Sequence, residues 1–251
     1  MDRLLELTYR SEQSHFWFRG FRQYMRPALA AAVKGVAAPR ALDCGCGTGS
    51  NLEMLRPFAN AVGFDLTWVG VEFARAHGHR VAQASIGAIP FRDATFDLVT
   101  SFDVLQCVPD DVERAALAEM WRLLKPGGRM LLNVSALEML PGRHSVLSAE
   151  FRRYTPASLR SLVEGTGFQI ERLTFTHLSL LPILLPVRVW QRWSAPGGEV
   201  QPGEFEISVP PAPINAVLSA VSMLEALALR VVDMPIGSSL LCLARKPAAH
   251  A

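Results

Sequence analysis

Short apolar runs alternate along this chain with longer segments whose apolar positions recur every three or four residues. The longer segments are typical of amphipathic helices, and short apolar runs are typical of buried strands. The runs predict strands at residues 40–43, 61–65, 80–83, 96–100, 129–134, 168–176 and 238–244. Strands that alternate with helices favour an α/β fold with a mostly parallel sheet.

The best-marked helix lies between the fourth and fifth predicted strands. Asp110 is suited to cap this helix, and Glu113 stands where its side chain can reach back to the cap. Pro126 and the two glycines after it prevent the helix from continuing. A second helix is expected to begin at Thr155, a cap residue, with Pro156 at its first helical position.

Residues 178–235 depart from this alternation. Their pattern predicts a proline-kinked helix over 178–193, a loop rich in proline and glycine over 194–213, and a helix over 214–232. The last helix carries an apolar stripe formed by Val217, Val221, Leu224, Ala228 and Val231. Because such a stripe is usually core, we expect it to pack inward, although two such helices can also wall an apolar cleft.

The length of 251 residues suits a single α/β domain. We divide this domain into an N-terminal helical lid (1–38), a ligand-binding core (39–177), a helical insertion (178–235) and a last strand (236–247). The insertion is expected to pack on the domain or to cover an acceptor site.

Composition narrows the class of protein. Hydrophobic residues make up 50% of the chain and charged residues 19%, which is typical of a globular protein. The net charge is +2 without a long Lys/Arg run, so we expect no nucleic-acid partner. The cysteines, Cys44, Cys46, Cys107 and Cys242, lack zinc-like spacing and are expected to be reduced thiols. The N-terminus lacks the apolar core of a signal peptide, and prolines interrupt the most apolar stretch, so we expect a cytoplasmic protein without a transmembrane segment.

A glycine-rich turn follows the first predicted strand. Residues 42–51 read Leu-Asp-Cys-Gly-Cys-Gly-Thr-Gly-Ser-Asn. Such a turn lets a ligand approach the backbone and meet unpaired amide hydrogens. A dinucleotide motif would require glycine where Ser50 stands. Asp43, at the end of the strand, suits a ligand with an amino group and a sulfonium and would repel a pyrophosphate, which favours S-adenosylmethionine over a nicotinamide cofactor.

Over residues 40–135 the chain resembles the class I S-adenosylmethionine-dependent methyltransferases with a type 11 methyltransferase domain. The resemblance rests on five segments in the family's order, at residues 43–49, 63–65, 89–91, 96–99 and 124–128. It implies a Rossmann-like fold with a seven-stranded, mostly parallel sheet, an antiparallel last strand and helices on both faces. It also implies methyl transfer from S-adenosylmethionine, by direct displacement, to a small-molecule or lipid-like acceptor. The alternatives are a non-catalytic interaction protein that retains the fold and a nicotinamide-dependent oxidoreductase.

The resemblance assigns roles in cofactor binding. Asp65 ends the second strand and can accept hydrogen bonds from both ribose hydroxyls, although it can also cap the following helix. Leu66 and Ile86 are expected to pack on the adenine, and Ser85 stands where the family often carries an acid. The candidate cofactor-binding residues are Asp43, Gly45, Cys46, Gly47, Gly49, Asp65, Leu66, Ser85, Ile86, Ser101, Trp17 and Arg19.

The acceptor side is marked by two outer segments. The aromatic cluster around Trp17 is either a packed helix or a lid, and in a lid Arg19 or His15 would contact a carboxylate. His144 and Tyr154 resemble a His-Asp pair and an Arg-Arg-Tyr-Thr run of some methyltransferases, and both are candidate catalytic residues. Ser145 replaces the Asp of that pair, which weakens the prediction of a general base.

Overall fold

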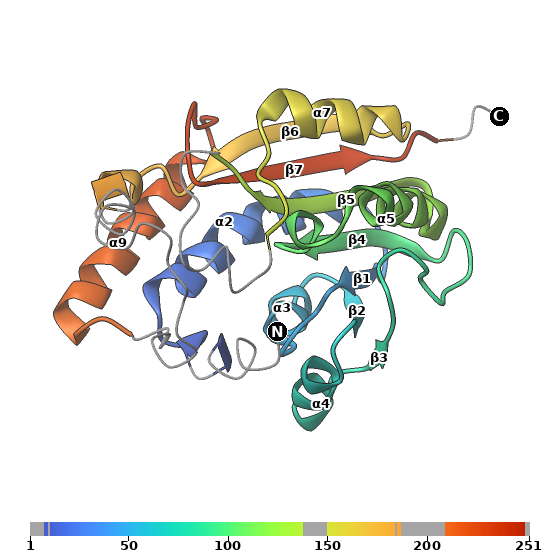
Figure 1. Cartoon of the computed structure of the whole chain (residues 1–251), viewed down its shortest axis with the longest axis horizontal. Coiled ribbons are helices and arrows are strands. Elements are labelled where there is room, and N and C mark those ends of the chain that lie inside the picture. The colour runs from blue at the N-terminus through green and yellow to red at the C-terminus, as the bar shows by residue number, and fades with distance from the viewer. Residues whose placement is uncertain (1–7, 10, 138–149, 184, 187–208, 249–251) are drawn as a thin grey trace.

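The structure is a computed structural model that describes residues 8–9, 11–137, 150–183, 185–186 and 209–248 (Figure 1). The strands are β1 (Arg40–Cys44), β2 (Asn60–Asp65), β3 (Val81–Gln83), β4 (Phe96–Phe102), β5 (Leu124–Ser135), β6 (Gln169–Thr176) and β7 (Ser239–Arg245). The helices are α2 (Phe16–Ala32), α3 (Ser50–Leu55), α4 (Trp68–Ala76), η1 (Leu105–Cys107), α5 (Asp110–Leu123), α7 (Pro156–Gly165) and α9 (Ala212–Ala228).

The strands form one seven-stranded sheet in the order β3-β2-β1-β4-β5-β7-β6. Strands β1 to β5 pair in parallel, whereas β7 runs antiparallel to both β5 and β6. The predicted α/β fold with an antiparallel last strand is therefore confirmed. All parallel strands end at one edge of the sheet, which is where ligands bind in open α/β folds.

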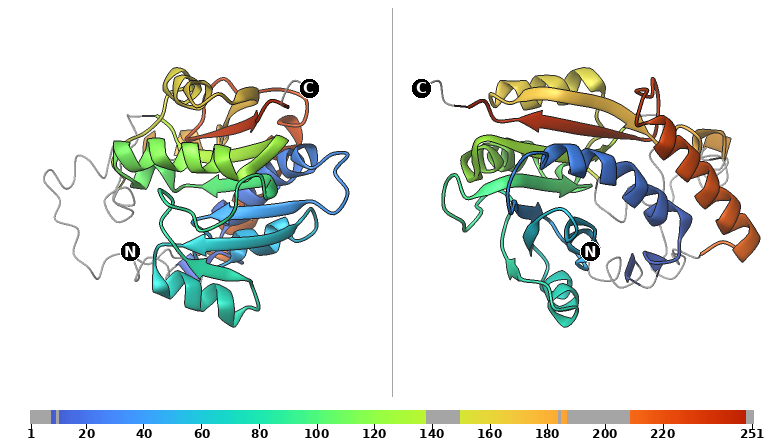
Figure 2. Two further views of the ribbon diagram at one scale, coloured as in Figure 1. Left: turned by 90° about the vertical axis from the view of Figure 1, so that its right-hand side faces the viewer. Right: turned by 180° about the vertical axis from the view of Figure 1, so that it is seen from behind.

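Side chains alternate between the two faces of the sheet and build two cores. Val99 and Leu132 pack with α5 and α7 on one face. Their neighbours Leu98 and Leu131 pack with α2 and α3 on the other. Figure 2 shows these helices on opposite sides of the twisted sheet. Alternate residues of the strands are therefore buried on both faces, as expected for a sheet that is covered by helices on each side.

The predicted capping of α5 is wrong, whereas that of α7 is confirmed. Asp110 is the first helical residue of α5, and the preceding Pro109 makes no side-chain cap. Glu113 does not reach back, because its carboxylate accepts hydrogen bonds from the Tyr154 hydroxyl and the Arg152 guanidinium. In α7, by contrast, Thr155 caps the helix through the expected local hydrogen bonds.

Helix α9 is oriented opposite to the sequence-based expectation. Its predicted stripe faces outward: Val217 is 62% exposed, Leu224 67% and Val231 84%. The inward face instead buries polar side chains, among them Asn215 and Glu225. The prediction of an inward apolar stripe is therefore wrong. The structure describes only part of the other helix predicted in the insertion (178–193), with helical residues at 181–183 and 185–186.

Hydrogen bonds explain why the polar side of α9 faces inward. Asn215 Oδ1 accepts from the backbone N–H of Phe16 at 2.8 Å, and its Nδ2 donates to the carbonyl of Ser14 at 2.9 Å. The carboxylate of Glu225 accepts from the backbone N–H groups of Leu178 and Ser179 at 2.9 and 2.8 Å. These bonds satisfy unpaired donors at the start of α2 and after β6, a requirement for buried backbone groups. Among the described helices, none combines the length and hydrophobicity needed to cross a bilayer.

The crossing of α2 and α9 gives a testable prediction for the fold. A Cβ atom at Gly20 would lie 2.9 Å from Ser222 Cβ. Overpacking costs about 1–3 kcal/mol, and alanine regains about 1 kcal/mol of helix propensity. We therefore expect Gly20→Ala to lower the free energy of unfolding by about 1 kcal/mol in urea titrations. With Ser222→Gly in the same chain, the Gly20→Ala substitution should no longer destabilise, and an unchanged penalty would contradict this packing.

Candidate functional site

A cavity of about 170 Å³ lies beside the glycine-rich turn at the carboxyl edge of the sheet. The turn contributes Gly45, Cys46, Gly47 and Thr48 to its wall, and Asn51 follows from α3. The other walls come from the N-terminal segment and from the end of β4. The structure thus brings the predicted glycine motif and the predicted lid together around one cavity.

The glycines of the turn serve different purposes. Gly45 has φ 79°, and a Cβ there would lie 2.5 Å from Val104. Gly49 has φ 91°, and a Cβ there would meet Ala74 and His79. Both positions therefore require glycine because of the backbone conformation and protein neighbours. Gly45 and Gly47 line the cavity, where a ligand could approach them closely. Gly49 does not line it, so packing within the protein explains this glycine.

Asp43 lies fully buried beneath the turn. Its Oδ1 accepts a hydrogen bond from the Thr100 hydroxyl at 2.6 Å, and its Oδ2 has no hydrogen-bond partner. Burial raises the pKa of Asp43 to about 7, the Thr100 hydrogen bond lowers it, and the nearby Asp65 carboxylate raises it further. A buried carboxylate with an unpaired oxygen is stabilised by a positive charge. Because Asp43 is not among the residues that line the cavity, its contact with a cationic ligand stays a prediction.

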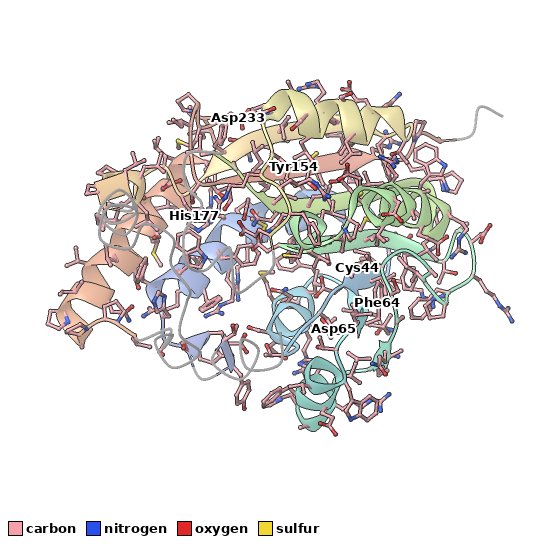
Figure 3. All side chains as sticks on the ribbon, viewed as in Figure 1. Cys44, Phe64, Asp65, Tyr154, His177 and Asp233 are labelled. Atoms are coloured by element: carbon pink, nitrogen blue, oxygen red, sulfur yellow. The ribbon has the colours of Figure 1, made fainter. Side chains whose placement is uncertain are left out.

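Asp65 ends β2, next to Cys44 at the end of β1 (Figure 3). Its Oδ2 accepts from the N–H of Gly47 at 2.8 Å, and its Oδ1 accepts from the backbone N–H and hydroxyl of Thr67 at 2.9 and 2.7 Å. Asp65 thus links the glycine turn to the start of α4, which is close to the predicted alternative of a helix cap. A carboxylate offers about four acceptor sites, and three are used here, so one remains for a ribose hydroxyl, and binding of the ribose stays a prediction.

The predicted adenine-side residues occupy different environments. Leu66 is 68% exposed, Ile86 is buried, and Ser85 is exposed with its hydroxyl accepting from the N–H of Gly87. Ser101 is buried at the end of β4, with no partner for its hydroxyl oxygen. None of these four lines the enclosed cavity. Their cofactor contacts remain predictions.

The N-terminal segment supplies the opposite wall of the cavity. Trp17, Phe18 and Phe21 line it, and the Trp17 ring stacks on His177 with centroids 4.1 Å apart. Arg22 also lines the cavity, whereas the predicted Arg19 is exposed and does not. Arg22 lies three residues after Arg19, on the side of α2 that faces the turn. The sequence pattern thus predicted the aromatic wall, the structure adds Arg22 to it, and the role of Arg19 stays a prediction.

Glu12 is a cavity residue that the sequence did not single out. Its buried carboxylate accepts from the Thr48 hydroxyl at 2.8 and 2.9 Å, and its carbonyl accepts from Arg22 at 2.9 Å. Burial raises the pKa of Glu12, whereas the Thr48 hydrogen bond lowers it. These contacts fasten the N-terminal segment to the glycine turn. These contacts could not be predicted from a local sequence pattern, because Glu12 and Thr48 are 36 residues apart.

A second missed residue, Asp103, follows β4 at the cavity. It has φ 59°, which is costly for a residue other than glycine and is often found at functional sites. Asn133 Nδ2 donates to its Oδ1 at 2.9 Å and Gln106 Nε2 at 3.2 Å. Nearby protein atoms raise the pKa of Asp103, although both hydrogen-bond donors lower it and the residue is exposed to solvent. The loop thus presents a carboxylate at the cavity.

Tyr154, one of the two predicted catalytic residues, is not among the residues that line the cavity. Tyr154 is buried, and its hydroxyl donates to Glu113; burial and that carboxylate raise its pKa. In Figure 3 it lies away from Asp65, across β4 and β5. His144 falls outside the described residues. Burial raises the pKa of the free Cys107 thiol to about 12, which argues against a nucleophilic thiolate.

The site fits the ligand that the sequence favoured. S-adenosylmethionine carries a sulfonium and an ammonium, and the Asp103 carboxylate that lines the cavity is of opposite charge. Arg22 supplies a positive charge for the carboxylate of the ligand. The cavity of about 170 Å³ is smaller than common ligand sites of about 300 Å³ or more. We therefore expect the adenosine part to lie outside it, along Asp65 and Leu66.

Comparison with known proteins agrees with this geometry. Residues 42–132 match the methyltransferase domain family. A probable S-adenosylmethionine-dependent methyltransferase of Mycolicibacterium smegmatis is 30% identical over 165 residues, which are 63% of this chain and 62% of that protein. A demethylmenaquinone methyltransferase of Deinococcus radiodurans is 30% identical over 188 residues, 71% of this chain and 74% of that protein.

A solved structure extends the likeness to nearly the whole chain. An S-adenosylmethionine-dependent methyltransferase of Thermotoga maritima has a TM-score of 0.59 at 20% identity, covering 98% of this chain and 97% of that one. At this identity the likeness concerns the fold alone. Taken with the curated relatives and the matched domain, however, it leaves one conclusion: the chain belongs to the class I S-adenosylmethionine-dependent methyltransferases.

Proposed function

We propose that this chain transfers the methyl group of S-adenosylmethionine, by direct displacement, to a small-molecule or lipid-like acceptor that bears a hydroxyl group. The observation that carries the proposal is Asp103, which lines the cavity next to the glycine turn. Asn133 and Gln106 hold its Oδ1, so that Oδ2 is left for a hydroxyl proton. An acceptor with no proton to lose would need no such carboxylate.

The cofactor supplies an already activated methyl group, so the protein has mainly to align the acceptor and exclude water. Trp17, Phe18 and Phe21 are placed to exclude water from the cavity. Asp103 accepts the acceptor's proton at Oδ2 and releases it later to solvent. A general base works best when its pKa is near the operating pH, and the pKa of Asp103 is shifted upward, toward that range.

The aromatic wall supports an acceptor with an apolar body. Three of the cavity residues from α2 are aromatic, and apolar walls with a few polar groups are typical of small-molecule sites. The relative from Deinococcus radiodurans is named for a quinone-type acceptor, which is itself lipid-like. We therefore place a hydroxyl-bearing lipid-like compound first among acceptors.

The experiment measures transfer of tritium from labelled S-adenosylmethionine to a panel of acceptors. The panel pairs a prenylated hydroquinone with its fully O-methylated analogue, a small polar alcohol with the matching amine, and includes bulk tRNA. We expect label in the hydroquinone and none in the analogue without a hydroxyl. Transfer only to the amine or to tRNA would contradict the proposal. The tRNA arm is needed because the expected absence of a nucleic-acid partner rests on charge alone.

A further inference from the structure

The outward side of α9 is an apolar surface. We define the α9 face by its exposed residues Ile214, Val217, Leu224, Leu227 and Val231. Ile183 and Leu185 are also exposed, on the segment whose start is bonded to Glu225 of α9. Large contiguous apolar patches are rare on monomeric proteins and usually mark an interaction site.

The outward orientation of this face is built into the structure. Asn215 bonds to the start of α2, and Glu225 bonds to the backbone at Leu178 and Ser179. The close approach of Ser222 to Gly20 fixes the same rotation of the helix. Turning the apolar stripe inward would break all of these contacts. The hydrogen bonds of Asn215 and Glu225 and the contact of Ser222 therefore keep the α9 face turned outward.

The exposed charges beside the face are mostly basic, and the exposed Asp233 after α9 is paired with Arg172. Between residues 209 and 229 the only charged residue is Glu225, which is buried on the inward side. Helix α2 contains no acidic residue, and its Arg19 and Arg26 are exposed. Arg230, just after α9, is exposed as well. Figure 2 shows α2 and α9 together on the side turned to the viewer in its right-hand view.

We propose that the α9 face docks on the surface of an anionic phospholipid bilayer, with α9 lying in the plane of the interface. An interfacial helix buries its apolar side among the lipid chains, and basic residues beside it are drawn to anionic headgroups. A second copy of this chain is a poorer occupant, because a symmetric contact would bring the same arginines toward each other. The proposal goes beyond the proposed function and does not depend on it.

Docking in this way would place the cofactor site next to the lipid. Asn215 of α9 is bonded to Phe16, and the neighbouring Trp17 lines the cavity. The apolar face and the cavity wall thus belong to adjoining elements. A protein held by α9 would present this wall close to the bilayer, where lipid-like compounds are concentrated.

The test is flotation of the full-length protein with vesicles. We expect binding to vesicles of phosphatidylcholine with phosphatidylglycerol, and roughly tenfold weaker binding to phosphatidylcholine alone or at high salt. Val217→Glu with Leu224→Glu should weaken binding to the anionic vesicles by at least about tenfold. Arg26→Glu should weaken it less and remove part of the salt dependence. Val36→Glu, at an exposed valine far from α9, is the matched control and should bind like the wild type.

Two other outcomes of these measurements would contradict docking of the α9 face on a bilayer. Failure of the wild type to bind anionic vesicles would overturn the proposal. Self-association that the two glutamates abolish, seen by sedimentation velocity without vesicle binding, would instead make the face a contact between copies. Binding of S-adenosylhomocysteine reports whether a variant is folded. If the glutamate variant does not fold, Val217→Ser with Leu224→Ser provides the same comparison, and unchanged vesicle binding by that variant would also refute the proposal.

Discussion

Replacing Asp103 with asparagine is expected to lower kcat by about 10²–10⁴-fold, the usual contribution of a general base. Asparagine has the same shape but cannot take up the acceptor's proton. It also tolerates the left-handed backbone at this position, where φ is 59°. The dissociation constant of S-adenosylhomocysteine should therefore change little. Steady-state kinetics on the best acceptor of the panel and calorimetry with S-adenosylhomocysteine measure the two quantities.

A matched control separates this effect from loss of a carboxylate in general. Asp93 is largely exposed and pairs with Arg122 outside the cavity. Asp93→Asn is therefore expected to leave kcat unchanged. Equal kcat in wild type and Asp103→Asn would mean that the acceptor enters without its proton or that another group removes it.

The pH dependence gives an independent signature of Asp103. The pKa of Asp103 is raised above the usual range for Asp, and the carboxylate form, which accepts the proton, is present above this pKa and is lost below it. We expect kcat of the wild type to fall about tenfold per pH unit below the pKa. The Asp103→Asn variant should show no such fall between pH 5 and about 7. A wild-type profile that is flat in this range would contradict a base with this pKa.

Asp65→Ala is expected to weaken binding of S-adenosylhomocysteine by more than about tenfold. A charge-assisted hydrogen bond contributes about 1.5–3 kcal/mol, and a ribose hydroxyl is expected to donate to the remaining acceptor site of this carboxylate. The substitution also removes the acceptor for the Gly47 N–H, which lies 2.8 Å from Oδ2. Loss of affinity could therefore arise from the ligand or from the turn, and calorimetry on Asp65→Ala alone cannot separate them.

Thr67→Val tests a further indirect cause, the loss of the α4 cap. The Thr67 hydroxyl donates to Asp65 and accepts from the N–H of Gly70 at the start of α4. Its removal should cost about 1 kcal/mol of stability, as for other helix caps, without removing a ligand contact. We expect Thr67→Val to retain affinity while losing stability in urea titrations. Equal losses of affinity in Thr67→Val and Asp65→Ala would assign Asp65 to support of α4 and not to the ribose.

Local patterns were sufficient for much of the fold. Every predicted strand is present within a few residues at its ends, except that β5 begins earlier, at Leu124. Thr155 and Pro156 predict the start of α7 because a cap acts on residues within one turn. The glycine-rich turn was also predictable, since Asp43, Gly45 and the following helix lie next to one another in the chain.

Contacts between residues that are far apart in the sequence determined the features that local patterns did not predict. Asn215 bonds to Phe16, 199 residues away, and this is why α9 turns its polar side inward. The hydroxyl of Tyr154 donates to Glu113, which is 41 residues away in the sequence. Asp103 gains its role from Asn133, on the neighbouring strand. The sequence alone determined the strands, the glycine turn and the family, because these depend on local periodicity and backbone chemistry. Only the tertiary structure decided which side of α9 is buried, which arginine faces the cavity and which carboxylate lies in it, because each depends on how distant segments pack.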